Sequence, residues 1–62
     1  MSMTKLIVEG REVKIGDLIV VEGDNWEEIG MVVSVDDEEI NMWDGKEGWF
    51  VKRDEIKKIY FR

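Results

Sequence analysis

The most constraining feature of this sequence is the segment over residues 16–37, in which two apolar runs flank an acidic loop. In the second run, residues 29–35, apolar side chains recur at positions 29, 31, 33 and 35. A period of two is typical of a pleated strand, because successive side chains point to opposite faces of a sheet. Gly30 has no Cβ, so we expect a neighbouring backbone or aromatic ring to pack closely there, or the strand to bend. The segment therefore predicts a strand, a loop, a second strand and a tight acidic turn.

Residue usage favours strands along the whole chain. Isoleucine and valine occupy 15 of the 62 positions, whereas alanine, glutamine and proline are absent and leucine occurs twice. Branched side chains suit a pleated sheet, and the best helix formers are scarce. Turn signals such as Glu9-Gly10 and Asp44-Gly45 divide the chain. The predicted elements are an N-terminal hairpin over residues 5–15, strands at 18–22, 29–35, 39–43, 48–51 and 57–61, and a 3₁₀ turn over 52–55.

These elements predict a single all-β domain over residues 1–62, folded as a small, strongly bent barrel of five or six short strands with one 3₁₀ turn before the last strand. Both alternating sets of residues in 18–21 and 32–35 are largely apolar, so Val21 and Val32 can replace their neighbours in the core. With that alternative open, the side chains expected to fill the core are Leu18, Val20, Met31, Val33, Ile40, Ile56, Ile59 and Phe61.

Several chemistries are excluded by composition. The chain has no cysteine and no histidine, so disulfides, zinc–thiolate sites, nucleophilic cysteine and histidine-based catalysis are ruled out. The carboxylates are all expected in solvent, and we therefore expect no catalytic residues, no metal site, no cofactor and no enzyme. Residues 1–5 are not followed by the apolar run of a signal peptide, and no stretch approaches the length of a membrane span. We accordingly expect a cytoplasmic location.

Charge is unevenly distributed along the chain. The net charge is −6, but residues 15–45 hold ten carboxylates and no Lys or Arg. Residues 46–62 hold six basic and three acidic residues, which gives a local charge of +3. The overall charge opposes binding to nucleic acid and favours a basic partner.

Over residues 16–59 the pattern resembles SH3-like barrels of the KOW and Tudor type. In KOW domains a Gly-x-Val step opens a strand that ends in an acidic turn, as in Gly30-Met31-Val32 and Val35-Asp36-Asp37. Tudor domains share two tryptophans, a strand that runs to an Asp turn, a returning strand and an Asp-Gly-like turn. The matching positions are Trp26, 33–36, 40–42, Asp44-Gly45, Trp49 and Glu55-Ile56. The resemblance implies a small barrel used for binding, although this chain is acidic and lacks the tyrosines of Tudor cages.

The leading hypothesis is a non-catalytic module that engages a basic protein, as an accessory or regulatory factor typical of phages and other mobile elements. Acidic loops and an exposed tryptophan would form the contact, since aromatic side chains often dominate interfaces. Two plainer alternatives are that the tryptophans fill the core and that the acidic surface is merely solvated. The candidate protein-binding residues are Trp26, Glu27, Glu28, Asp36, Asp37, Glu38 and Trp43. A methyl-ammonium cage would instead use Trp26, Trp43, Trp49 and Asp44.

The second hypothesis is a KOW-type module for nucleic acid or for transcription and translation. Lys58, Tyr60 and Arg62 alternate along the last strand, where two cations could pair with phosphates and the ring could stack on a base. The third hypothesis is a structural subunit that assembles with its own copies through sheet edges.

Overall fold

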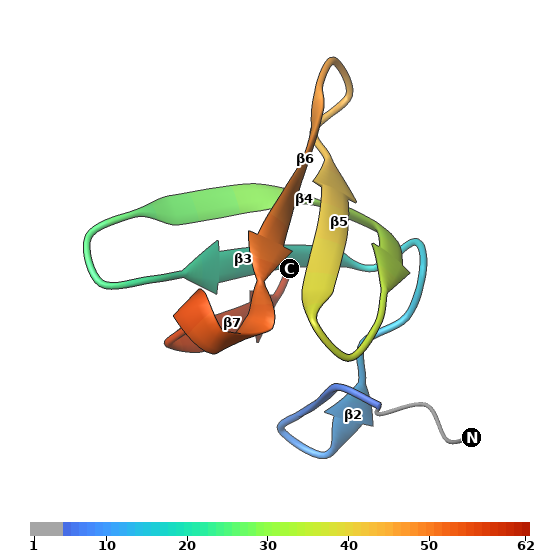
Figure 1. Cartoon of the computed structure of the whole chain (residues 1–62). Coiled ribbons are helices and arrows are strands. Elements are labelled where there is room, and N and C mark those ends of the chain that lie inside the picture. The colour runs from blue at the N-terminus through green and yellow to red at the C-terminus, as the bar shows by residue number, and fades with distance from the viewer. Residues whose placement is uncertain (1–4) are drawn as a thin grey trace.

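The computed structural model describes residues 5–62, which form an all-β chain with one short 3₁₀ turn (Figure 1). The all-β prediction and the 3₁₀ turn before the last strand are confirmed. Residues 1–4, on which part of the signal-peptide expectation depends, lie outside the described residues. The elements are β1 (Ile7–Val8), β2 (Arg11–Glu12), β3 (Leu18–Glu22), β4 (Glu27–Val35), β5 (Glu39–Trp43), β6 (Gly48–Lys52), the turn η1 (Arg53–Glu55) and β7 (Lys58–Phe61). In residues 5–62 no helix is long and apolar enough to cross a lipid bilayer.

Five strands form one antiparallel sheet in the order β6-β5-β4-β3-β7, and β1 pairs with β2 in a separate hairpin. The predicted barrel is not closed. Among residues 5–62 no ladder joins β6 to β7, so both strands are edges of the sheet. The reason lies in the short connection after η1, where the N–H of Lys57 donates to the carbonyl of Glu22 at 2.7 Å and directs β7 onto β3.

Strand β4 belongs to both halves of the sheet. Its first residues pair with β3, from Glu27 opposite Glu22 to Met31 opposite Leu18. Its last residues pair with β5, and the register shifts between Val32 and Ser34, as in a β-bulge. In Figure 1 the strand runs along β3 and then bends down beside β5. A bulge bends its strand and increases the local twist, so β4 curls the sheet around the core.

The core lies on one side of this curled sheet, here called the inner face. It contains Val13 from the N-terminal segment, and it is built mainly from Ile19, Val21, Val32, Ile40, Met42 and Val51. Leu6, Val8, Trp26, Trp49, Ile56, Ile59 and Phe61, all partly buried, pack against this cluster. Of the predicted core residues, Ile40 is fully buried, and Ile56, Ile59 and Phe61 pack on the cluster as expected.

The predicted core was wrong for part of β3 and β4. Leu18 and Val33 are about half exposed, at 54% and 47%, and Met31 is only partly buried. The register explains the difference, because Ile19 stands between Gly30 and Phe61 on the same face. Once Phe61 points inward, Ile19 must do the same, and its neighbours Leu18 and Val20 point outward. Val20 is buried as predicted, but it lies outside the core cluster.

The expectation that something packs closely on Gly30 is confirmed. A Cβ at this position would lie 3.0 Å from the carbonyl oxygen of Trp43 and 3.3 Å from Cη2 of Trp49. Trp49 comes from β6, so its indole reaches past β5 to cover the inner face of β4. Glycine therefore creates the space in which this large ring packs.

The N-terminal hairpin is attached to the sheet by both packing and charge. Val13 is 1% exposed in the core, and its N–H donates to the carbonyl of Leu6 at 2.8 Å. The guanidinium of Arg11 lies 4.0 Å from the centre of the Phe61 ring and 3.4 Å from a carboxylate oxygen of Asp17. In Figure 1 the hairpin lies below the five-stranded sheet.

The assignment of faces can be tested with two neighbouring valines. Val32→Ala removes buried methyl groups and is expected to lower the free energy of unfolding by about 2–3 kcal/mol. Val33→Ala changes an exposed residue at the bulge and is expected to lower it by less than about 1 kcal/mol. Urea unfolding of the two variants measures both values. A larger loss for Val33→Ala would contradict the assignment.

Candidate functional site

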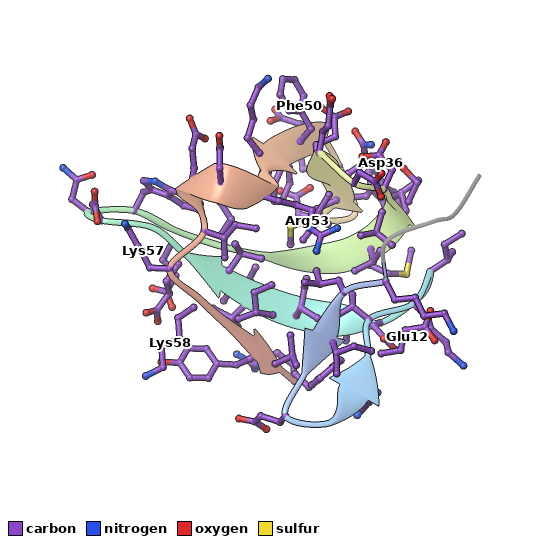
Figure 2. All side chains as sticks on the ribbon, turned by 60° about the horizontal axis from the view of Figure 1, so that its bottom comes forward. Glu12, Asp36, Phe50, Arg53, Lys57 and Lys58 are labelled. Carbon is purple, nitrogen blue, oxygen red and sulfur yellow. The ribbon has the colours of Figure 1, made fainter. Side chains whose placement is uncertain are left out.

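The side of the sheet away from the core, here called the outer face, is also apolar. The register places Leu18, Met31 and Trp43 side by side on β3, β4 and β5. It likewise aligns Tyr60, Val20 and Ile29 across β7, β3 and β4. The large apolar residues of this face are Leu18, Val20, Ile29, Met31, Val33, Trp43, Phe50 and Tyr60. Most of them are exposed, and Figure 2 shows Phe50 standing clear of the ribbon.

Trp43 forms a ridge between two shallow hollows of the outer face. The larger hollow, about 480 Å³, lies between Trp43 and Phe50 and includes Val33, Ser34 and Asn41 in its lining. The amide of Asn41 donates to the Ser34 hydroxyl at 3.0 Å, which places a satisfied polar pair inside it. The other hollow, about 300 Å³, is lined by Leu18, Ile29, Gly30, Met31, Trp43, Asp44 and Gly45. Trp43 is 44% exposed and lines both hollows. This agrees with the prediction that its side chain lies on the opposite face of the strand from Ile40 and Met42.

The structure does not bring the predicted acidic site together as one face. Glu27 and Glu28 open β4, whereas Asp36, Asp37 and Glu38 form the turn after it, nine strand residues later. Nine residues of strand span about 30 Å along the backbone. Glu27 and Glu28 also point to opposite faces, because the register pairs Glu28 with the inward Val21 and Glu27 with the outward Glu22. The carboxylates therefore form two clusters, one at each end of β4.

Trp26 lies at the first of these ends, on the inner side. It is partly buried and packs on the core cluster, and a Cβ on Gly23 would overlap its indole. The loop that holds it is closed by a hydrogen bond from the N–H of Gly23 to the carbonyl of Trp26 at 2.9 Å. Trp26 and Trp49 border a cavity of about 160 Å³, here called the indole pocket. Its lining is completed by Glu28, Phe50, Val51 and Glu55.

The four residues of the predicted methyl-ammonium cage are therefore divided. Trp26 and Trp49 share the indole pocket, but Trp43 and Asp44 line a hollow on the outer face. Trp49 also carries a buried indole N–H that has no acceptor among the described residues. Such a group costs about 1–3 kcal/mol, which the burial of the large ring offsets.

The two acidic turns share one hydrogen-bonding pattern. In the first, Oδ1 of Asp36 accepts the N–H groups of Glu38 and Glu39 at 2.9 and 3.0 Å. In the second, Oδ1 of Asp44 accepts the N–H groups of Lys46 and Glu47 at 2.9 and 2.8 Å. These backbone donors hold the pKa of both carboxyl groups below the ordinary value of 3.8. Asp36 and Asp44 therefore act first as closures of their own turns.

The turn at Asp36 is also held from outside. The guanidinium of Arg53 donates to the backbone carbonyl of Asp36 at 2.9 Å, and the N–H of Arg53 donates to the carbonyl of Glu38 at 2.8 Å. The turn before β7 thus supports the turn between β4 and β5, and both labelled residues are visible in Figure 2.

The predicted cationic stripe lies on β7 and at its end. The ammonium of Lys58 is 5.1 Å from the centre of the Tyr60 ring, and its interactions with Tyr60 and then with Glu22 raise the pKa of Lys58. Tyr60 is partly buried and stands beside Val20 in the register. Arg62 follows the strand, and its N–H donates to the carbonyl of Leu18 at 2.9 Å. The ring is therefore already covered in part, which leaves less of it for stacking on a base.

Sequence reasoning missed Phe50, Ile29 and Glu55. A signal for Phe50 and Ile29 was present in the sequence. Both odd- and even-numbered residues of β4 and β6 are apolar, so each strand has two apolar faces. Glu55 carried no signal, since only the fold brings η1 to the start of β4. Among residues 5–62 no three Asp or Glu side chains are placed to hold a metal ion.

Comparison with known proteins gives no match, whether to a protein-family model, to a curated protein or to a solved structure.

The closure of the acidic turns predicts a pH effect. Because folding lowers the pKa of Asp36 and Asp44, their stabilisation is present above pH 3.8 and is lost as the pH falls below it. Asp36→Asn with Asp44→Asn keeps an acceptor oxygen but cannot titrate. The stability difference between wild type and this variant should shrink below about pH 4 in urea unfolding series. Glu47→Gln with Asp54→Asn is the control of equal charge, and an identical pH profile for both variants would contradict the account.

Proposed function

We propose that this chain is a non-catalytic binding module that holds another protein on its outer face. The observation that carries the proposal is the exposure of Leu18, Ile29, Val33, Trp43 and Phe50 on one side of one sheet. With about 4.8 Å between strands and about 3.3 Å per residue, the face covers roughly 400 Å². A patch of this size on a small monomer is often an interaction site.

The charges around this face favour a partner with a basic rim. Glu22, Glu27 and Asp44 lie on or beside the face, and the segment over residues 15–45 contains no cation. Of the three carboxylates at the face, Glu27 and Asp44 form no ion pair with a Lys or Arg of residues 5–62, and Glu22 interacts with Lys58. A basic rim would relieve this repulsion and speed association, and association should slow as salt rises.

We further propose that the fold is an SH3-like barrel of the KOW or Tudor type that is left open at one seam. Support comes from the four-strand meander β3-β4-β5-β6, the 3₁₀ turn and the return of β7 beside β3. Small barrels of this kind serve many binding roles, so the function is argued from the outer face and not from the fold.

The proposal is tested by charge insertion into the face. Proteins captured from cytoplasm by the wild type are identified, the basic candidates are purified, and their dissociation constants are measured by calorimetry. Trp43→Lys with Phe50→Lys should weaken binding at least about 100-fold, since a buried aromatic anchor is commonly worth 2 kcal/mol or more. Ile7→Lys with Ile15→Lys is the matched control, because both residues are exposed and belong to the N-terminal segment. Equal losses in both variants would overturn the proposal.

The two other hypotheses give different results in the same experiment. Self-assembly would appear as a dimer of the wild type in sedimentation equilibrium that Trp43→Lys with Phe50→Lys dissociates. Binding to nucleic acid would appear as a shift of single-stranded oligonucleotide at about 50 mM salt, where phosphate contacts are strong. We expect no such shift, because the chain is acidic and Tyr60 is partly covered by Lys58. A shift that Lys58→Glu with Arg62→Glu abolishes would instead support the nucleic-acid hypothesis.

A further inference from the structure

We propose that the indole pocket binds the guanidinium group of an arginine side chain. That the natural ligand is an arginine of the bound protein rests on the proposed function. That the pocket binds a guanidinium group does not depend on it, and this can be tested with a short peptide.

Two indoles contribute to the lining of the pocket, and each packs against a glycine. Trp26 lies over Gly23 and Trp49 lies over Gly30, and neither glycine could carry a Cβ without moving the ring or its surroundings. The two rings border the same cavity of about 160 Å³. Tryptophan is the side chain whose ring face attracts a cation most strongly. Both rings also pack on the core cluster, so a ligand would not have to order them, which lowers the entropic penalty of binding.

Two carboxylates line the same cavity without a cation of their own. Glu28 enters from the inner face of β4, and Glu55 enters from η1. Neither makes an ion pair or a side-chain hydrogen bond within residues 5–62. The neighbouring cations are engaged elsewhere, since Lys57 pairs with Asp24 at 3.7 Å and Arg53 donates to the carbonyl of Asp36. A ligand cation would therefore meet two uncompensated negative charges.

Arginine fits this lining better than lysine. Its guanidinium is flat, stacks on aromatic faces and carries five N–H donors that can reach two carboxylates at once. A lysine ammonium is a compact and strongly hydrated charge, and it gains less from contact with an indole ring.

The pocket adjoins the outer face at the edge strand β6. Trp49 and Phe50 line both the indole pocket and the larger hollow beside Trp43. Because no strand of residues 5–62 pairs with the far side of β6, one partner could cover the outer face and reach around this edge into the pocket. The proposed arginine therefore belongs to a residue at the rim of the partner's surface.

The test is a titration of the ¹⁵N-labelled full chain with the peptide acetyl-Gly-Arg-Gly-amide, followed through the three indole N–H signals. The signals of Trp26 and Trp49 should move and that of Trp43 should not. Peptides with lysine or uncharged citrulline in place of arginine should bind more weakly, in that order. Glu28→Gln and Glu55→Gln should each weaken binding about three- to tenfold, because each removes a charge-assisted contact in a partly open site.

Glu27→Gln is the matched control, since it removes the same charge from the adjacent residue on the opposite face of β4. It should change the affinity less than about twofold. Equal effects of Glu27→Gln and Glu28→Gln, a lysine peptide that binds more tightly than the arginine peptide, or unmoved Trp26 and Trp49 signals would each overturn the proposal. Trp43→Lys alone changes a residue of the outer face that does not line the pocket, and it should leave peptide binding intact. A chain that binds the peptide but no protein would therefore refute the proposed function and not the pocket.

Discussion

The close packing of Trp49 on Gly30 is the contact on which the arrangement of this small sheet depends. The indole fills the inner face of β4 at a position where a Cβ would meet it at 3.3 Å. With Gly30 turned inward, Ile19 and Phe61 beside it in the register must also be inward. The bulge between Val32 and Ser34 then bends β4 so that Val35 and Ile40 close the other half of the core. One glycine therefore decides which apolar set is buried and which is left exposed.

A sheet with two apolar faces is costly for a free chain of this size. The inner face is covered by Val13, Leu6 and Val8, whereas no described element covers Trp43, Leu18 or Phe50. The carboxylates beside the exposed face contribute to the net charge of −6, which opposes self-association. In the function that we propose, the same carboxylates would select for a basic partner. In that proposal the apolar face and its acidic rim form one binding surface, and the indole pocket extends it around the edge strand β6.

Much of the fold could be predicted from residue types, because turns and period-two runs are local signals. The strand at residues 39–43 and the 3₁₀ turn agree with the structure closely. The faces of β3 and β4 could not be assigned in this way, since Leu18, Ile19, Val20 and Val21 are all apolar and the cross-strand register alone distinguishes them. The candidate site was harder to predict than the fold. Trp43 was identified by its phase against Ile40 and Met42, but the acidic residues separate along β4. The meeting of Glu28 with Glu55 depends on tertiary structure.

The most direct test of this account is the solvent exposure of the three tryptophans, measured by ¹⁹F NMR of the 5-fluorotryptophan-labelled chain in H₂O and D₂O. We expect a large solvent isotope shift for Trp43, an intermediate one for Trp26 and a small one for Trp49. Addition of the protein partner should then reduce the shift of Trp43 more than that of the other two. A larger isotope shift for Trp49 than for Trp43 would show that the faces of the sheet are assigned the wrong way round.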